Sequence, residues 1–544
     1  MPFSTYRFIL IPTFASTASF KLLTVKPYKV LLLCPPPIEV IEPWVDAPPY
    51  ARNTLAFLAG YLRQFPGFEI KIVEAKFEQL SFQETLKRAV AFEPDLVGIT
   101  AYTQEIKPAA YVAGLIKKEL PQVVTVIGGV HITAIPRETL FEFPTFDYGV
   151  AGEGEITFAE LCSALKSGAA IAEIKGLVYR NKQEVFLNPQ RERLLDQDSL
   201  PIPAWDLMPK ADIYFIHTER GCPFNCVFCL NHNGRVARKR SIDLVIEEME
   251  MLIRDYKPSR IFFGDELFSV DMKRTALLLN KMIERGIHKK ITWDAQTHVK
   301  YVNFDLLSKM RAANVFRIDM GVETGDDDRL REMGKGTNAP MIAKAFAEAK
   351  RAGVKAGGLF IFGHPNETVE SIRNTIRFAV KINPDLPMFG TMTPYPGTEV
   401  ARLAAEGKAG YTGLSFDWDD YKMRLGSGLT YRHLTKRKLN LLMLEAYIKI
   451  YLFNHRYLDF AKFVWSYRFG AIQLLKKIFY KEDVLHERMK KPLDYDAVIN
   501  SRYHIKAINM VQSREYFSEI QKAEMNRTKK EMPELLLSQI AIEA

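Results

Sequence analysis

Three cysteines lie within eight residues of one another, in a segment that reads ERGCPFNCVFCL at Glu219–Leu230. Cys222, Cys226 and Cys229 have the spacing C-x3-C-x2-C, so one short loop can present three thiolates. Three thiolates can bind three irons of a [4Fe–4S] cluster, and the fourth iron then stays open to another molecule. The spacing therefore predicts a catalytic cluster with these cysteines as its metal ligands.

A zinc site is the alternative for the same cysteines. A structural zinc ion takes four closed ligands, and His232 could supply the fourth. The two other cysteines, Cys34 and Cys162, are far away, whereas a disulfide framework would spread cysteines along the chain. Clustered cysteines in a large enzyme favour a metal site in a reducing compartment, which predicts a cytoplasmic protein.

The elements that position the cysteine loop are alternating strands and helices. The first series has uninterrupted apolar strands separated by helical stretches, which indicates a doubly wound, Rossmann-like parallel sheet that binds ligands at the carboxyl ends of its strands. Its expected strands are Lys29–Cys34, Glu69–Val73, Asp95–Tyr102, Val123–Gly129 and Tyr148–Ala151.

A second βα series begins near Ile213, and its first strand runs directly into the cysteine loop. Six βα units predict a partial (β/α)6 barrel of the TIM type, with its chemistry at the carboxyl ends of the strands. The expected strands are Tyr214–His217, Arg260–Phe263, Ile291–Asp294, Arg317–Met320, Gly357–Phe362 and Met388–Thr393.

The pattern divides the α/β chain into five parts. We expect an N-terminal extension at 1–27, the doubly wound domain at 28–170, a hairpin with a Pro-containing linker at 171–209, the barrel at 210–425 and a mainly helical region at 426–544. The stretch Met1–Leu23 is only weakly similar to a signal peptide, so we interpret it as a disordered arm or as the product of a start assigned too far upstream.

Composition sets limits on the partners. The 544 residues carry a net charge of +10, and 47% of them are hydrophobic, which is typical of a globular enzyme with a basic solvated surface. We expect no nucleic acid partner. The aromatic and basic stretch Phe460–Phe479 is interpreted as a helix packed on the barrel, and peripheral membrane contact is the alternative.

The cysteine segment resembles the radical S-adenosylmethionine superfamily. The matching pattern is C-x3-C-x-aromatic-C, with Phe228 at the aromatic position. The resemblance implies that the amine and carboxylate of S-adenosylmethionine bind the open iron. An electron from the cluster then cleaves the molecule to a 5′-deoxyadenosyl radical.

Other strand ends resemble the same family. Gly264-Asp265-Glu266 is similar to the segment that binds the methionine amine, although the middle residue departs from the family pattern and leaves the choice between Asp265 and Glu266 open. Glu323, in GVETG, stands where the family binds the ribose hydroxyls. Gly363 belongs to GLFIFGHPNE, which resembles the segment that packs on adenine.

The first βα series resembles the cobalamin-binding domain of one branch of this superfamily. The resemblance rests on CPPP at Cys34–Pro37, GITAYT at Gly98–Thr103, GGVHIT at Gly128–Thr133 and GEGE at Gly152–Glu155. It implies cofactor contacts from Thr100, Thr103, Gly128, Gly129 and His131.

The cobalt-ligating pattern Asp-x-His-x-x-Gly of other cobalamin domains has no counterpart here. The region interpreted as equivalent, Val73–Phe82, contains no His, which implies that cobalamin binds without a histidine on cobalt. His131 lies in the wrong segment to replace that ligand and is interpreted as a loop residue.

The expected function is radical chemistry on an unactivated carbon, with methyl transfer ahead of oxidative cyclisation or radical rearrangement. A non-catalytic cobalamin or iron–sulfur sensor is the alternative from another class, and the intact cysteine triad disfavours it. A tRNA methylthiotransferase would need further cysteines upstream. The expected partners are a small-molecule or lipid-like substrate and an electron donor such as flavodoxin or ferredoxin.

Overall fold

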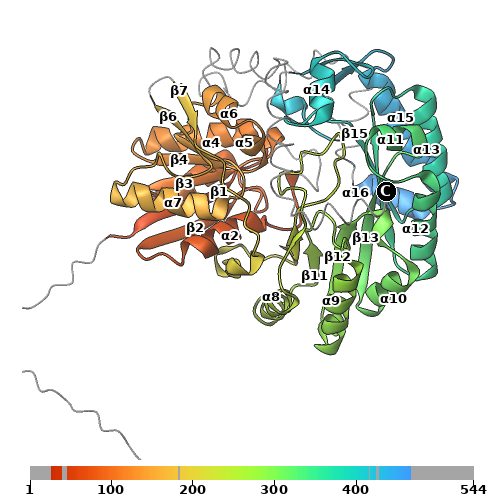
Figure 1. Cartoon of the computed structure of the whole chain (residues 1–544), viewed down its shortest axis with the longest axis horizontal. Coiled ribbons are helices and arrows are strands. Elements are labelled where there is room, and N and C mark those ends of the chain that lie inside the picture. Colours follow the sequence, from red (N-terminus) through yellow and green to blue (C-terminus); the bar gives the residue numbers. More distant parts are fainter. Residues whose placement is uncertain are drawn as a thin grey trace, which may run out of the picture.

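The computed structural model describes residues 26–38, 46–181, 184–415, 417–423, 428–466 and 468. Nearly all of the expected N-terminal extension, the part of the aromatic and basic stretch that follows residue 468 and the polar tail lie outside the described residues. Two parallel sheets stand side by side, each with its own helices (Figure 1).

The first sheet has the order β2-β1-β3-β4-β5-β6-β7. The first five strands are parallel, which confirms the expected doubly wound domain, and the hairpin β6–β7 joins antiparallel to β5. The strands are β1 (Tyr28–Cys34), β2 (Phe68–Glu74), β3 (Leu96–Thr100), β4 (Val124–Gly128), β5 (Tyr148–Val150), β6 (Leu177–Asn181) and β7 (Glu184–Leu187). The helices are α2 (Asn53–Leu62), α3 (Phe82–Phe92), α4 (Ile106–Glu119), α5 (Val130–Ala134), α6 (Pro136–Glu142) and α7 (Gly154–Ser167).

The second sheet has six parallel strands in the order β15-β14-β13-β12-β11-β8, as the six βα units predict for a partial barrel. The strands are β8 (Ile213–Ile216), β11 (Arg260–Phe263), β12 (Thr292–Thr297), β13 (Val315–Glu323), β14 (Ala356–Phe362) and β15 (Leu386–Thr391). The helices are α8 (Ile242–Asp255), α9 (Met272–Glu284), α10 (Phe304–Ala312), α11 (Asp327–Glu332), α12 (Ala339–Arg351), α13 (Val369–Ile382) and α14 (Glu399–Ala405).

Local sequence explains where the barrel helices begin. Each starts after a Ser, Thr, Asp or Asn whose side-chain oxygen accepts a hydrogen bond from a backbone N–H in the first turn. These N-caps are Ser241, Asp271, Asn303, Asp326, Asn338, Thr368 and Thr398.

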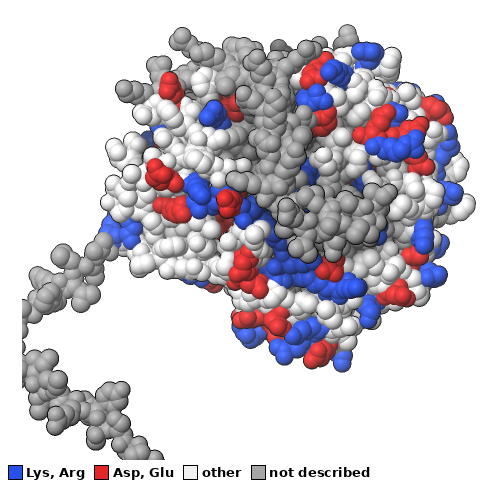
Figure 2. All heavy atoms as spheres, in the orientation of Figure 1, with Lys and Arg blue, Asp and Glu red and all other residues white. Residues whose placement is uncertain are grey.

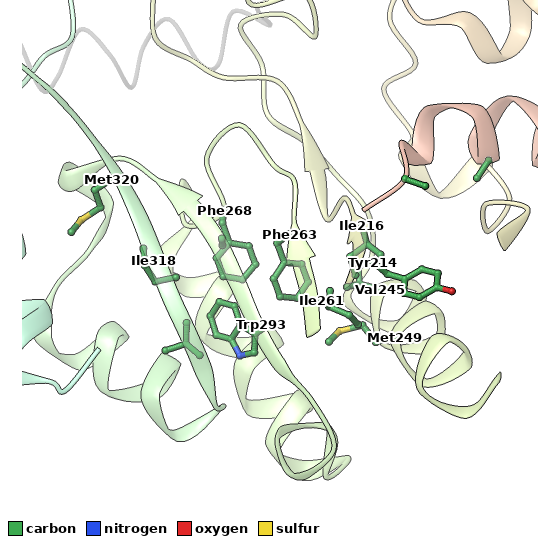
Figure 3. Packing of buried hydrophobic residues seen from close by; sticks show 14 of the residues in the cluster. Tyr214, Ile216, Val245, Met249, Ile261, Phe263, Phe268, Trp293, Ile318 and Met320 are labelled. Atoms are coloured by element: carbon green, nitrogen blue, oxygen red, sulfur yellow. The ribbon is translucent and has the colours of Figure 1, made fainter. Parts of the chain in front are cut away.

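Aromatic side chains fill the centre of the barrel core (Figure 3). The rings of Phe263 and Phe268 stack with their centroids 4.7 Å apart, and Trp293 packs against both. Trp293 is fully buried, and its indole N–H donates to the carbonyl of Ala313 at 2.8 Å. This packing fixes the strand ends that carry the candidate site.

The helical C-terminal region also contains a short strand. Helices α15 (Lys436–Leu452) and α16 (Tyr457–Ser466) follow the antiparallel pair β16 (Tyr411–Leu414) and β17 (Leu429–Tyr431). The three-residue strand β17 lies within the region expected to be mainly helical, and it pairs with a strand on the barrel side of that boundary. None of the described helices is both long and apolar enough to cross a membrane.

A segment far along the chain completes the first domain's core. Trp418 and Tyr421 are buried in the same cluster as the side chains of α4, α5 and α6. The Trp418 indole donates to the Glu142 carboxylate at 2.8 Å, and Lys107 on α4 forms ion pairs with Asp417 and Asp419. The two domains are therefore joined by a polar and apolar contact as well as by the linker.

Replacing Trp418 by Ala should destabilise the N-terminal domain by about 3–5 kcal/mol, the usual cost of removing a buried Trp. Trp465 is the matched control because 72% of its surface is exposed, so Trp465→Ala should change stability little. Chemical denaturation of both variants checks this, and equal losses would show that Trp418 contributes no more than a surface residue.

Candidate active site between the two sheets

The cysteine loop leaves the barrel at the carboxyl end of β8 and is closed by the short antiparallel pair β9 (Glu219–Arg220) and β10 (Arg238–Lys239). The Cys222 N–H donates to the carbonyl of Gly234 at 2.9 Å, and the Asn231 amide donates to the carbonyl of Cys222 at 2.6 Å. One backbone and one side-chain hydrogen bond thus hold Cys222 in place.

The middle of the loop is tied to the barrel on both sides. The Val227 N–H donates to Met333 at 3.1 Å, and the Val227 carbonyl accepts from Val400 at 3.1 Å. Phe228, the aromatic residue of the motif, is half-buried and packs against the hydrophobic core. Phe224 stacks on His298 with centroids 4.2 Å apart. Hence Phe228 helps to anchor the loop.

The root of the loop is held by carboxylates from the other domain. Glu153 accepts two bonds from the Arg238 guanidinium, at 2.8 and 2.7 Å, and Glu155 accepts one from Arg220 at 2.7 Å. Burial alone would raise the pKa of Glu153, but the two bonds with Arg238 and the charge of Arg220 hold it below its usual value. We call these four residues the carboxylate clamp.

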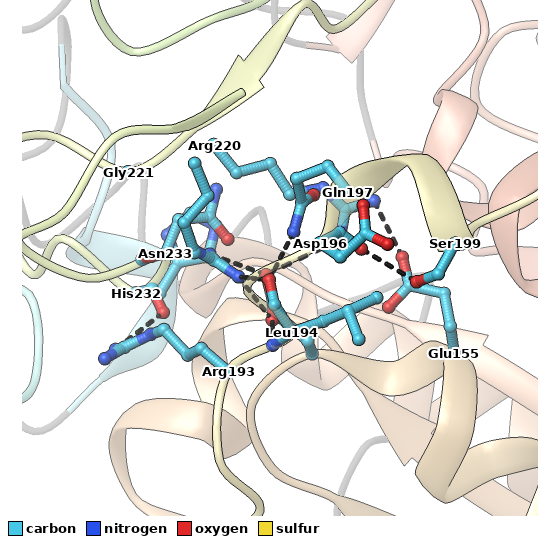
Figure 4. A network of polar contacts seen from close by, with 12 residues as sticks. Glu155, Arg193, Leu194, Asp196, Gln197, Ser199, Arg220, Gly221, His232 and Asn233 are labelled. Carbon is cyan, nitrogen blue, oxygen red and sulfur yellow. Dashed lines mark hydrogen bonds and ion pairs between the residues drawn. The ribbon is translucent and has the colours of Figure 1, made fainter. Parts of the chain in front are cut away.

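A polar network surrounds the clamp (Figure 4). The Leu194 carbonyl accepts from Arg238 at 2.8 Å and also from the Gln197 amide, while Arg193 donates to the carbonyl of His232 at 3.2 Å. The linker segment, the GEGE loop and the cysteine loop therefore form one polar unit. Sequence reasoning assigned GEGE to the cobalamin domain and missed this contact with the loop.

The two acidic residues after β11 have different surroundings. Asp265 is buried, and its carboxylate accepts from the N–H and hydroxyl of Thr218, both at 2.6 Å, and from the Glu219 N–H at 3.1 Å. Glu266 is only partly buried and accepts from the Gly221 N–H at 3.1 Å and from Asn233. Asp265 therefore shapes the start of the loop, whereas Glu266 lies beside the cysteines.

Gly264, just before this pair, lies where the structure leaves no room for a side chain. A Cβ at Gly264 would collide with the ring of Phe215, which packs directly over it. The lack of a side chain at Gly264 therefore lets Phe215 pack against the end of the strand.

Glu323 ends β13 in a strained conformation. Its φ is +62°, which is uncommon for a residue with a Cβ and costs about 1–3 kcal/mol. Its buried carboxylate forms an ion pair with Lys335, and its carbonyl lies 3.5 Å from Nε2 of His364. Burial raises the pKa of the Cys226 and Cys229 thiols, and the negative charge of Glu323 raises it further.

Gly363 ends β14 with φ of +95°, and a Cβ there would collide with the Tyr431 hydroxyl. Its N–H and that of His364 both donate to one carboxylate oxygen of Glu367. The other oxygen, Oε1, is buried without a hydrogen-bond partner among the described residues. Burial raises the pKa of Glu367 to about 8, so a neutral carboxyl is favoured there.

Burial raises the pKa of the Cys222 thiol to about 12 and that of Cys226 to about 11. Metal ligands must be deprotonated, so iron binding displaces these protons. In the described part of the chain, no group of three or more His, Cys, Asp and Glu side chains is placed to hold a single metal ion. The chemistry of three thiols on one anchored loop fits a multi-iron cluster.

In the first domain, the carboxyl end of β4 carries two glycines with different surroundings. Gly129 has φ of +96°, and a Cβ there would meet the backbone of Ala101 at 2.8 Å, so only glycine fits. Among the described residues, a Cβ at Gly128 would meet only one atom, at 3.9 Å, so a side chain would have room there. Thr100 and Thr103 are buried beside it.

The interpretation of His131 as a loop residue is wrong. It lies on α5, is fully buried and packs edge-on against Trp418 with centroids 5.0 Å apart. Its Nδ1 lies 3.3 Å from the Thr103 hydroxyl, and burial lowers its pKa to about 3. His131 therefore supports the loop after β3 from within the core.

Lys and Arg side chains gather near the middle of one face, where the two halves of the molecule meet (Figure 2). Among the described cations, Lys335 and Arg235 carry positive charges that lower the pKa of the Cys226 thiol. Positive charge here favours anionic groups such as a carboxylate or a phosphate.

Comparisons with known proteins agree with this geometry. A model of the Radical SAM superfamily matches residues 216–379, and a model of the B12 binding domain matches residues 49–162. An uncharacterized methyltransferase of Pyrococcus horikoshii is 35% identical over 438 residues, which cover 78% of this chain and 93% of the relative.

Two further similarities are more distant. The anaerobic magnesium-protoporphyrin IX monomethyl ester cyclase of Rubrivivax gelatinosus is 28% identical over 64% of this chain and 65% of that protein. The structure of the cobalamin-dependent radical enzyme OxsB, with aqua-cobalamin and S-adenosylmethionine bound, shares the fold with a TM-score of 0.64 and 16% identity over 93% of this chain and 81% of its own.

The chain therefore belongs to the radical SAM superfamily and, within it, to the enzymes that carry a B12-binding domain. The two matched models are those of domains that use S-adenosylmethionine and bind cobalamin.

Replacing any one of Cys222, Cys226 and Cys229 by Ala should abolish cleavage of S-adenosylmethionine, because the cluster loses a ligand. Iron content and 5′-deoxyadenosine release after anaerobic reconstitution measure this. The control is the Cys34→Ala, Cys162→Ala double variant, which should keep its iron because both thiols are buried in the core. Release of 5′-deoxyadenosine by the triple variant would contradict the assignment.

Glu367→Gln should remove part of the pH dependence of stability. The folded pKa of about 8 lies above the ordinary value, so the folded state binds the proton more tightly than the unfolded state. The free energy of unfolding should therefore fall as pH rises from about 4.5 to about 8, the range set by the unfolded and folded pKa values. Gln keeps an oxygen acceptor and carries no charge, so the variant should lose this slope. Denaturation at several pH values measures it, and an unchanged slope would contradict the shift.

Proposed function

We propose that the protein is a cobalamin-dependent radical SAM methyltransferase that acts on an unactivated carbon. The observation that carries the proposal is the contact between the two domains' strand ends. The carboxylate clamp joins the loop after β5 to the cysteine loop after β8, so the expected cofactor sites face each other. Such closeness favours transfer to a short-lived radical over its quenching.

The cluster supplies the electron that cleaves S-adenosylmethionine, and cobalamin carries the methyl group. In this proposal Cys222, Cys226 and Cys229 hold the cluster. Glu266 accepts a hydrogen bond from the methionine amine, because Asp265 already accepts hydrogen bonds from the backbone N–H groups of Thr218 and Glu219. The partly buried Glu266 is the carboxylate left to meet a ligand beside the loop.

Glu323 and Gly363 would bind the rest of S-adenosylmethionine. The ion pair with Lys335 fixes Glu323, whose strained backbone persists only where the surroundings enforce it. We assign it to the ribose hydroxyls. Gly363 and its neighbours are assigned to the adenine, where the orphaned Oε1 of Glu367 offers a polar atom.

On the cobalamin side, the uncrowded end of β4 at Gly128 and the tight turn at Gly129 would admit the cofactor, with Thr100 and Thr103 beside it. The sequence contains no His before position 131, and His131 itself is packed in the core. Both observations support binding without a histidine on cobalt.

The proposed substrate is a small or lipid-like molecule. Cluster-forming thiols need a reducing compartment, which supports a cytoplasmic location and an electron donor such as flavodoxin or ferredoxin.

Oxidative cyclisation is the second candidate, and the similarity to the magnesium-protoporphyrin cyclase favours it. The two functions differ in their products. A cyclase forms 5′-deoxyadenosine without a proportional amount of S-adenosylhomocysteine. A methyltransferase consumes a second S-adenosylmethionine as the methyl source.

Reaction with S-adenosylmethionine labelled at the methyl group, a reductant and a small-molecule extract as the substrate pool should yield 5′-deoxyadenosine and S-adenosylhomocysteine in equal amounts. Chromatography with mass detection counts both and finds the labelled product. The Cys222→Ala variant is the control and should form neither product in excess of background. Extract-dependent 5′-deoxyadenosine alone would reject methyl transfer and leave the cyclase.

A further inference from the structure

Helix α16 exposes large apolar side chains that the proposed function does not use. No residue of this helix is buried. Leu458, Lys462 and Trp465 follow one another at i, i+4 and i+7, so they lie along one face of the helix. Leu458 is 79% exposed and Trp465 is 72% exposed, and Tyr457 and Val464 are exposed on the neighbouring stripe. We call these four apolar side chains the α16 patch.

The opposite face of α16 attaches the helix to the barrel. Phe463 stacks on Tyr447 of α15 with ring centroids 4.6 Å apart, and Phe460 packs on Tyr451 at 5.6 Å. The Tyr447 hydroxyl in turn accepts a hydrogen bond from the Phe389 N–H of β15 at 3.1 Å. The inner face is therefore committed to packing, and this packing holds the α16 patch outward on a fixed support.

The start of α16 lies at the end of the barrel that is remote from the candidate site. Arg456, just before the helix, donates to the carbonyl of Pro384 at 2.7 Å and to that of Asp385, and both residues precede β15. The strands of this sheet are parallel, and the cysteine loop follows the carboxyl end of β8. In Figure 1, α15 and α16 lie in blue on the barrel half of the molecule. The α16 patch can therefore be altered without touching the site.

The charges on α16 favour an anionic partner. Asp459, the acidic side chain of this helix, forms an ion pair with Arg456 at 3.1 Å. Lys462 is exposed between Leu458 and Trp465. The guanidinium carbon of Arg468 lies 5.0 Å from the centre of the Trp465 ring. Positive charge therefore accompanies the exposed apolar surface.

We propose that the α16 patch is a membrane-binding surface that docks the enzyme on a bilayer containing anionic phospholipids. A helix of this kind lies in the plane of the membrane, with its apolar side chains at the boundary between headgroups and acyl chains. Trp and Tyr are enriched at this depth, and Lys and Arg are attracted to the lipid phosphates. This inference does not depend on the reaction that the enzyme catalyses.

Charge favours a membrane over a second copy of the chain as the occupant. Two copies that met through this face would bring the cations of one α16 towards those of the other, and like charges across an interface are unfavourable. Anionic headgroups attract the same cations. The sequence that follows keeps this composition, since residues 469–481 contain no Asp or Glu and include Lys476, Lys477 and Lys481.

Flotation of the full-length, cluster-reconstituted protein with phosphatidylcholine vesicles, with and without phosphatidylglycerol, tests this proposal. The wild type should bind the vesicles that contain phosphatidylglycerol. Lys462→Glu should weaken this binding by at least about fivefold, because it reverses a charge at the anionic surface. The Leu458→Ala, Trp465→Ala double variant should weaken it by at least about tenfold, because it removes apolar surface that the bilayer would bury.

Helix α9 supplies matched controls. Lys273 and Leu277 are exposed on this helix and are four residues apart, like Leu458 and Lys462. Lys273→Glu and Leu277→Ala should bind vesicles as the wild type does. All these variants should release 5′-deoxyadenosine at the wild-type rate, which shows that they are folded and separates a loss of docking from a loss of activity.

Three outcomes would overturn the proposal. The first is a wild type that binds neither kind of vesicle, and the second is binding that the α16 variants retain in full. The third is a dimer that sedimentation velocity detects in the wild type and not in Trp465→Ala, without vesicle binding, which would assign the patch to self-association. A wild type that binds vesicles but cleaves no S-adenosylmethionine would reject the proposed function and leave this inference standing.

Tryptophan fluorescence gives a second measurement that uses only a conservative variant. Trp205, Trp293 and Trp418 are buried, whereas Trp465 is exposed to water. Vesicles that contain phosphatidylglycerol should therefore shift the emission of the wild type to shorter wavelength. Trp465→Phe keeps an apolar ring for docking but should lose this shift. An equal shift in Trp465→Phe would overturn the proposal.

Discussion

The carboxylate clamp is the interaction on which the site depends. Arg220 and Arg238 pair across β9 and β10 at the root of the cysteine loop, and both guanidinium groups bond to carboxylates of the first domain. Buried ion pairs contribute little net stability, but removing one partner leaves an unpaired buried charge and costs about 3–5 kcal/mol. The pairs therefore act chiefly by specifying one arrangement of the two domains.

The carboxylates around the loop have distinct roles. Glu153, Glu155 and Asp265 are satisfied by guanidinium or backbone donors and determine the shape of the loop. Glu266 and Glu323 act on the thiols through their charge, and partners from the chain fix the direction of each, namely Gly221 and Asn233 for Glu266 and Lys335 for Glu323. Preorganised acceptors of this kind bind a ligand without reorganisation, which is the property that controlled radical formation requires.

The fold and the cysteine loop were readable from the sequence because both depend on local patterns. Alternating apolar strands and helices predict two parallel sheets and the segments that form their strands, and the cysteine spacing predicts the cluster ligands. The clamp was not readable, because Glu153 and Arg238 are 85 positions apart and no local signal links them. His131 was misjudged for the same reason, since Trp418, which buries it, comes from a distant segment.

Insertion of Trp418 into the first domain's core also has a consequence for synthesis on the ribosome. The strands of the first sheet are complete once residue 187 has emerged, but the ring that covers α5 and α6 is encoded more than two hundred residues later. At about 5–20 residues per second, the ribosome needs roughly ten to fifty seconds to reach it. During this interval the nascent domain exposes apolar surface, so cellular chaperones have a defined period in which to shield it.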